Sequence, residues 1–260
     1  MSGSDAERIS SGAFDKGMRP YAPINKLKPV CDDVWIVDGP VIRFGLPWPR
    51  FPFTTRMTII RLSDGGLFVH SPTEMTEDLR AAVDALGPVR VLLGPNRIHF
   101  WWLPEWRAAY PDAQVWIAPK IREHAKGRID FPAEITAGET GYPWDADLKT
   151  LPIVGDFMTE VEIFHPASRT LVLTDFIENF ELKRVKSPLL RWLIKLDGLA
   201  APNGRMPRDM RLTFLRQRKS LSEAVRKMIA WDPERVIIAH GKWFERDGAQ
   251  ELRRAFAWLL

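Results

Sequence analysis

The stretch "RVLLGPNRIHFWWLPEWRAAYPDAQVWIAP", residues 90–119, decides the fold of this chain. It begins with a short run of aliphatic residues, which is typical of a strand buried on both faces. A helical segment that ends before Pro111 follows, and "AQVWIAP" at 113–119 has the pattern of a second buried strand. The alternation of strand, helix and strand predicts a layered α/β structure.

The segments on either side extend this pattern. Residues 56–72, "RMTIIRLSDGGLFVHSP", predict a hairpin with a glycine turn. Residues 73–87 predict a helix that Thr76 caps and Gly87 closes. The second half of the chain predicts three short strands, then a helix, a buried strand and an amphipathic C-terminal helix: "LKTLPI" at 148–153, "TEVEIFHP" at 159–166, "RTLVLTD" at 169–175, "SLSEAVRKMIAWDP" at 220–233, "RVIIAHG" at 235–241 and "GAQELRRAFAWLL" at 248–260.

Composition and charge narrow the class of protein. The 260 residues are 45% hydrophobic and 27% charged, as in globular proteins with a sizeable core, and the formal net charge of +4 gives no reason to expect nucleic acid as a partner. A single cysteine, Cys31, excludes an intrachain disulfide and a cysteine-rich zinc site. Neither a signal-peptide core nor a membrane span of roughly 18 apolar residues is evident, so we expect a cytoplasmic protein. We expect a flexible N-terminal arm over residues 1–28 and a single domain over 29–260.

Three polar side chains follow buried strands at equivalent places. His99 comes after "VRVLLG", Asp175 ends "RTLVLTD", and His240 ends "RVIIAHG". In layered α/β folds, ligand sites gather where strands end and loops begin. Two imidazoles and a carboxylate are suitable ligands for one zinc, iron or manganese ion. The alternative is structural, because residues at strand ends also serve as caps and hydrogen-bonding partners in the core.

The motifs Pro-Asn-x-x-His at 95–99, Thr-Asp-Phe-Ile-Glu-Asn at 174–179 and Ala-His-Gly at 239–241 together resemble a divergent branch of the metallo-β-lactamase-like superfamily, the domain of unknown function 4336. The resemblance covers about residues 30–260. It implies a four-layer αββα sandwich, with two mixed sheets face to face and helices outside.

The same resemblance implies a degenerate metal site. On an ungapped overlay, Asn96, Ile98, Phe100 and Trp101 fall on the four metal-binding positions of the His-x-His-x-Asp-His signature, and a shift can place His99 on one of them. A two-metal site is therefore not expected. The set that remains is His99, Asp175 and His240. Asn96, Asp156 and Asn179 are possible helpers, with Asp156 the candidate catalytic base.

Three functions remain open at this stage. The first is a mononuclear metal-dependent hydrolase of an ester, thioester or phosphoester. The second is a non-catalytic protein that uses the inherited cleft to bind a small molecule or a partner protein, with Phe100, Trp101 and Trp102 favouring an apolar ligand if they face that cleft. The third is a membrane-surface protein that uses the basic, apolar segment 183–196. For that segment the pattern favours a helix that covers the sheet.

Overall fold

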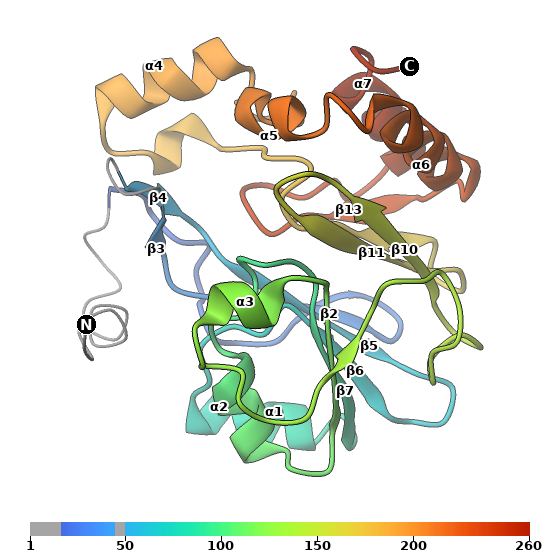
Figure 1. The fold of residues 1–260 in the computed structure, drawn as a ribbon. Helices are drawn as coiled ribbons and strands as arrows, with labels where there is room; N and C mark the ends of the chain where they lie inside the picture. Colours follow the sequence, from blue (N-terminus) through green and yellow to red (C-terminus); the bar gives the residue numbers. More distant parts are fainter. Residues whose placement is uncertain (1–16, 45–49) are drawn as a thin grey trace.

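Two β-sheets packed face to face form the centre of the molecule, and helices cover their outer faces (Figure 1). The structure is a computed structural model, and it describes residues 17–44 and 50–260. The layers run helix, sheet, sheet, helix, so the predicted αββα arrangement is confirmed. The helices of the described residues are α1 (Glu77–Asp84), α2 (Leu103–Ala109), α3 (Ile121–Ala125), α4 (Pro188–Asp197), α5 (Arg208–Thr213), α6 (Arg218–Ala230) and α7 (Gly248–Ala255), with a 3₁₀ turn, η1, at Leu182–Arg184.

The first sheet is built from the first half of the chain. Its strands lie in the order β1-β2-β5-β6-β7-β8-β9. Antiparallel pairing joins β1 to β6, and parallel pairing continues from β6 to β9. The bounds are β1 Lys28–Cys31, β2 Val34–Asp38, β5 Arg56–Arg61, β6 Leu67–His70, β7 Val89–Gly94, β8 Gln114–Ile117 and β9 Glu134–Ile135.

The second sheet comes from the second half, in the order β10-β11-β12-β13. Its strands are β10 Lys149–Val154, β11 Thr159–His165, β12 Thr170–Val172 and β13 Arg235–Ile237. Alternate residues of a strand point to opposite faces. Accordingly Val172 and Ile237 join the core between the sheets, whereas Leu171 and Val236 join the core under α6 and α7. The sheet is therefore buried on both faces, and even Glu160 and Glu162 of β11 are fully buried.

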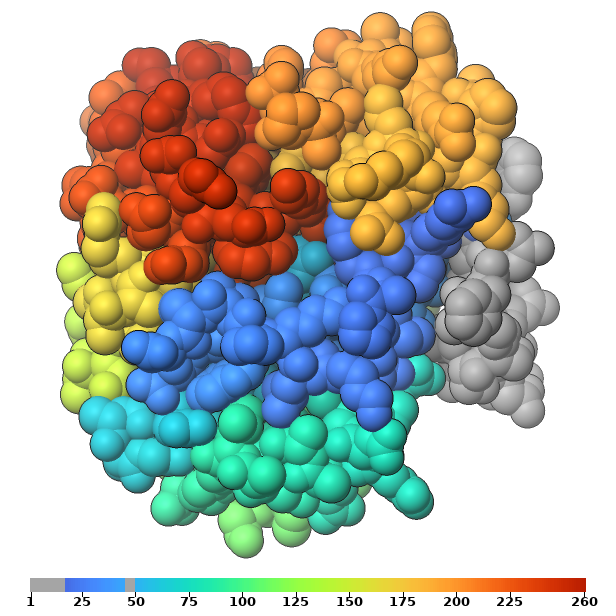
Figure 2. All heavy atoms as spheres, turned by 180° about the vertical axis from the view of Figure 1, so that it is seen from behind, coloured from blue at the N-terminus to red at the C-terminus, as the bar shows by residue number. Residues whose placement is uncertain are grey.

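The described N-terminal residues pack against the domain. Met18 is buried beside Val185, and the backbone N–H of Arg19 donates to the carbonyl of Arg184. Figure 2 shows the blue N-terminal segment lying across the rear face, between the C-terminal half and the cyan and green residues. Within the arm expected over residues 1–28, Met18 thus buries its apolar side chain in a cluster with Val41 and Val185. The rest of that expectation, residues 1–16, lies outside the described residues.

Two further expectations need correction. The Pro-rich, aromatic stretch "LPWPRFPF" at 46–53 predicts a packed loop. Phe51–Phe53 instead forms strand β4, which pairs with β3 (Ile42–Phe44), and residues 45–49 lie outside the described residues. Helix α4 does not cover a sheet. Its buried residue Ile194 packs in the small cluster that contains Met18, and the side chains expected to face the sheet lie in solvent.

No helix within the described ranges 17–44 and 50–260 is both long enough and apolar enough to cross a membrane.

The loop after β13 approaches another chain segment so closely that it admits only glycine. Gly241 has φ +102°, and a Cβ there would lie 2.2 Å from the backbone oxygen of Asn179. Gly127 has a similar φ of +87°, but open space surrounds it.

Replacing Gly241 with alanine is therefore expected to lower the free energy of unfolding by about 3 kcal/mol or more, because backbone strain and a backbone collision add. Gly127→Ala, which adds strain alone, is the matched control and is expected to cost about 1 kcal/mol. Urea denaturation of both variants measures the difference. Equal losses would show that Gly241 is not held against Asn179.

Candidate metal centre

The strand pairing explains why Asp175 and His240 meet. Strands β12 and β13 are parallel neighbours with Val172 opposite Ile237. Asp175 and His240 each follow three residues beyond that pair, so they leave the sheet at the same edge. The backbone N–H of Asn179 donates to the carbonyl of His240, which ties the two loops together.

His99 reaches the same place from the other sheet. Strand β7 ends at Gly94, and the carbonyl of Pro95 accepts the backbone N–H of Val161 in β11, which joins the two sheets at this point. The side-chain oxygen of Asn96 then accepts the backbone N–H groups of Ile98 and His99. This local turn directs the His99 ring toward the second sheet.

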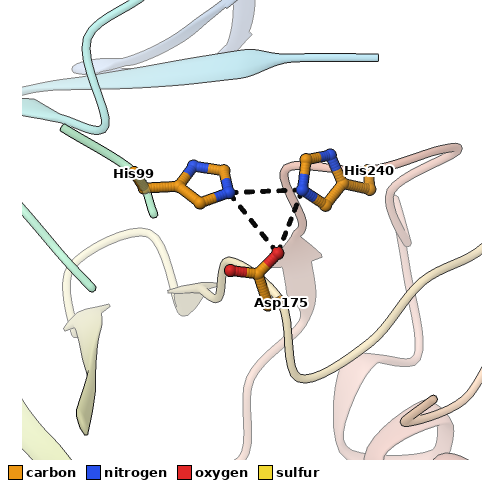
Figure 3. Close-up of side chains that lie close together, drawn as sticks. All are labelled: His99, Asp175 and His240. Atoms are coloured by element: carbon orange, nitrogen blue, oxygen red, sulfur yellow. Dashed lines mark hydrogen bonds and ion pairs between the residues drawn. The ribbon is translucent and has the colours of Figure 1, made fainter. Parts of the chain in front are cut away.

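The three side chains converge on one point (Figure 3). The Nε2 atoms of His99 and His240 are 3.2 Å apart. Asp175 Oδ1 lies 3.4 Å from Nε2 of His99 and 3.0 Å from Nε2 of His240. All three side chains are at least nine-tenths buried, with 10%, 5% and 5% of their surface exposed for His99, Asp175 and His240.

Outer hydrogen bonds orient these groups. The Nδ1–H of His240 donates to the carbonyl oxygen of Thr54 at 2.6 Å, so in the neutral ring the lone pair of Nε2 faces the centre. Nδ1 of His99 forms a hydrogen bond with Ser71 Oγ at 2.8 Å. Oδ2 of Asp175 accepts the side-chain N–H of Asn96 at 2.6 Å, which leaves Oδ1 for the centre.

The donor triangle fits a single metal ion. Zinc binds nitrogen and oxygen ligands at about 2.0–2.2 Å, and in tetrahedral geometry this separates ligand atoms by about 3.3–3.6 Å. The observed separations of 3.2, 3.4 and 3.0 Å are close to that range. Two imidazole nitrogens and one carboxylate oxygen also suit iron and manganese, and three protein ligands leave positions open for water or substrate.

Buried carboxyl groups surround the centre. Burial alone raises the pKa of Asp175, but His99 and His240 outweigh it and hold that pKa below its usual range. Glu160 accepts the backbone N–H groups of Thr174 and Asp175, and burial together with the Asp175 charge raises its pKa to about 7. Burial and the neighbouring Glu160 raise the pKa of Glu162 well above its usual value. Asp175 is therefore the carboxyl group of this set whose ionised form its surroundings favour most.

A cavity of about 350 Å³ opens beside the three side chains. His99, Asp175 and His240 line one part of it. Most of the remaining wall is apolar, with Phe51, Phe53, Ile98, Phe157 and Met210 among its residues. Such a mixture of apolar walls and a few convergent polar groups is typical of small-molecule sites.

The structure changes the set of candidate helpers. Asp156 is exposed, accepts a hydrogen bond from Gln217, and is not among the described residues that line the cavity. It lies in the turn between β10 and β11, at the edge of the second sheet from which Asp175 and His240 also leave, and the next residue, Phe157, lines the cavity. Asn179 lies beside the loop of His240, where its amide donates to the Lys242 carbonyl and accepts from Gly204. Its role is to hold the loops together.

The sequence interpretation missed Glu178, which lines the cavity together with the three side chains. Its position three residues after Asp175, in the motif Thr-Asp-Phe-Ile-Glu-Asn, was the available signal. Burial and the charge of Asp175 raise the pKa of Glu178 well above its usual value. Burial therefore favours the protonated form of Glu178.

Of the aromatic residues after His99, Phe100 belongs to the core, whereas Trp101 and Trp102 are half-buried and line a small pocket with His99. Phe100 is buried and its ring stacks on that of Trp101. Neither lines the 350 Å³ cavity. Among the described residues, His99, Asp175 and His240 are the one cluster of three or more side chains placed to share a metal ion.

Comparisons with known proteins agree with this architecture. Residues 50–188 match the family model described as a domain of unknown function, DUF4336. A search of curated proteins found no match. Among solved structures, the metallo-β-lactamase of Pontibacter korlensis has a TM-score of 0.58 at 13% identity, with 90% of this chain and 98% of that chain covered.

Two further solved structures illustrate the range. The metallo-β-lactamase FIM-1 from Pseudomonas aeruginosa, in its mono-zinc form, has a TM-score of 0.54 at 12% identity and covers 90% of this chain and 96% of that one. The flavodiiron core Flv1 from Synechocystis has a TM-score of 0.59 at 12% identity, with 90% of this chain and 60% of that chain covered. At such low identity these similarities establish the fold, which is that of the metallo-β-lactamases.

The buried carboxyl of Glu162 yields a prediction about pH and stability. Its folded pKa lies above its unfolded pKa, so the folded state holds a proton that the unfolded state releases above about pH 4.5. Stability therefore falls as pH rises, by about 1.4 kcal/mol per pH unit, until the folded carboxyl ionises. Glu162→Gln removes this penalty. We expect the stability of the variant relative to wild type to be greater at pH 7 than at pH 5.

Urea denaturation at the two pH values measures the change, and Glu123→Gln, at an exposed position, is the control. A difference between Glu162→Gln and wild type that does not vary with pH would contradict the assigned burial of this carboxyl.

Proposed function

Because this chain belongs to the DUF4336 family and has the metallo-β-lactamase fold, we propose that it is a hydrolase with one metal ion held by His99, Asp175 and His240. The observation that carries the proposal is the triangle of Nε2, Nε2 and Oδ1, with edges of 3.2, 3.4 and 3.0 Å. Substrates with an ester, thioester or phosphoester bond fit this chemistry. A divalent ion bound there supplies Lewis-acid polarisation and lowers the pKa of a water molecule.

A single ion is proposed because the signature positions for a second one carry no suitable ligands. Those two positions fall on Phe100 and Trp101, whose aromatic side chains cannot bind a metal ion. Phe100 is buried against Trp101. The chain's own groups keep the three ligands in place: Thr54 holds the His240 ring, Ser71 contacts the His99 ring, and Asn96 orients the Asp175 carboxylate.

The cavity supports a substrate with an apolar acyl or aryl group. Phenylalanine side chains form much of its wall, and its volume of about 350 Å³ accommodates a group of moderate size. Glu178 lines the same cavity, and its raised pKa makes it a proton donor to the leaving group. A water-poor, apolar wall also strengthens the electrostatic interactions of the polar groups at its base.

A second candidate function is a binding protein without catalysis. The 3.0 Å contact between His240 Nε2 and Asp175 Oδ1 also has the length of a charged hydrogen bond. If the ring of His240 carries a second proton, the pair neutralises itself and needs no metal. The cavity then binds an apolar small molecule without chemistry. Metal content separates the two candidates.

The metal proposal predicts about one zinc, iron or manganese ion per chain in protein purified without chelators. His240→Ala is expected to weaken metal affinity about 100-fold or more, because one of three protein ligands is lost. Elemental analysis after dialysis measures both. His124→Ala is the matched control, since it removes an imidazole outside the centre and should leave the metal content unchanged. Wild-type protein that neither contains nor takes up these metals would support the non-catalytic candidate.

A separate prediction concerns the catalytic roles of Glu178 and Asp156. With p-nitrophenyl esters of increasing acyl length as probes, Glu178→Gln is expected to lower kcat about 100-fold, as for loss of a general acid. Asp156→Asn, on the exposed turn, should leave kcat within about twofold. If the Asp156 variant loses activity and the Glu178 variant keeps it, the assignment of Glu178 is wrong.

A further inference from the structure

Helix α4 presents apolar side chains to solvent. Leu189, Trp192 and Leu196 are 66%, 57% and 53% exposed, at spacings of three and four residues that place them on one side of the helix. Leu212 and Leu215, at the end of α5 and just beyond it, are 65% and 59% exposed. Figure 1 shows α4 and α5 at the same end of the molecule, above the β3–β4 hairpin. We call these five residues the apolar face.

This exposure does not come from a poorly docked helix. Ser187 caps α4 through the backbone N–H of Leu190, and Gly198 closes it in the left-handed conformation. Ile194 is buried on the opposite side, where it packs against the cluster that contains Met18 and Phe180. The carboxylate of Asp197 pairs with Arg208, which joins α4 to α5. The fold therefore holds the apolar face outward.

The same region concentrates positive charge. Residues 183–219 contain eleven Lys and Arg against two Asp, a formal charge of +9 in a chain whose total is +4. Lys195, Arg216 and Lys219 are exposed and have no carboxylate partner among the described residues. The remainder of the chain therefore carries a net charge of −5. The segment that carries the apolar face is therefore strongly basic, and the remainder of the chain has a net negative formal charge.

From these observations we propose that the apolar face docks the protein on an anionic membrane surface. Leucine and tryptophan side chains insert at the level of the headgroups, and Lys and Arg contact the lipid phosphates. The positive charge of this segment favours an anionic surface as the binding partner. A neutral apolar partner would gain no electrostatic attraction from it, and a second copy of the same face would be repelled by like charge. The described helices do not span a bilayer, so the contact is peripheral.

The apolar face lies close to a groove that adjoins the cavity of the candidate metal centre. A groove of about 310 Å³ runs beneath α4, lined in part by Leu190, Leu193 and Ile194. It shares Phe51, Phe53 and Glu178 with the cavity beside His99, Asp175 and His240. A molecule from the lipid surface would reach that cavity through this groove, whose shared wall also carries Asp209. The docking itself stands on the surface residues and does not depend on a bound metal.

Co-sedimentation of the full chain with vesicles tests the proposal. Vesicles of phosphatidylcholine alone are compared with vesicles that also contain phosphatidylserine. We expect several-fold stronger binding to the anionic vesicles, and a decrease as salt rises because exposed charges are screened. Equal binding to both vesicle types, or none to either, would overturn the proposal.

Matched variants assign the contact to the apolar face. Lys195→Glu with Lys219→Glu should weaken binding about tenfold or more, and Trp192→Ser with Leu196→Ser should weaken it comparably. The controls make the same kinds of change elsewhere: Arg90→Glu with Lys126→Glu, and Ile135→Ser, which is 47% exposed on β9. All these positions are exposed, so folding should persist, and circular dichroism checks it.

Controls that weaken binding as much as the α4 variants would overturn the assignment. Sedimentation equilibrium of the protein without vesicles tests the alternative that a second copy of the chain covers the apolar face. A dimer that dissociates in the Trp192→Ser, Leu196→Ser variant would show that a second copy covers the face, and would also overturn the membrane proposal.

Discussion

The buried carboxylate of Asp175 is the constraint on which the site depends. An ionised carboxylate with 5% of its side chain exposed is unstable in a protein interior unless positive charge or hydrogen-bond donors compensate it. Asn96 donates to one oxygen, and His99 and His240 face the other. The raised pKa values of the neighbouring glutamates, about 7 for Glu160 and above the usual value for Glu162, reduce the negative charge beside Asp175. Either a metal ion or a protonated imidazole completes the compensation.

Much of this arrangement could be predicted from the sequence, and the reason is topological. The strands that carry Asp175 and His240 are short and nearly all apolar, which is typical of neighbouring buried strands in one sheet. Their polar ends therefore fall at one edge. His99 lies on the other sheet, and no periodicity indicates how two sheets are placed against each other. That His99 meets Asp175 and His240 could be expected only from the family resemblance of the strand-end motifs, or seen in the structure.

The differences between expectation and structure also have physical causes. Asp156 was chosen by its place in an alignment, but the β10–β11 turn carries it into solvent, where Gln217 binds it. Glu178 was overlooked because a carboxyl group in a loop is ordinarily exposed, and only the crossing of that loop beside Gly241 buries it. In α4, helical periodicity identified an apolar side correctly. It could not tell that Ile194 would take the buried position and leave Trp192 in solvent. Amphipathic patterns locate a face but do not identify what covers it.

X-ray absorption spectroscopy of the zinc-loaded protein tests the central claim most directly, because it reports the atoms around the ion. The account predicts one tightly held zinc with two imidazole nitrogens and one carboxylate oxygen at about 2.0–2.2 Å, and loss of one imidazole shell in His240→Ala. A zinc ion surrounded by oxygen ligands alone, or a spectrum that His240→Ala leaves unchanged, would contradict it.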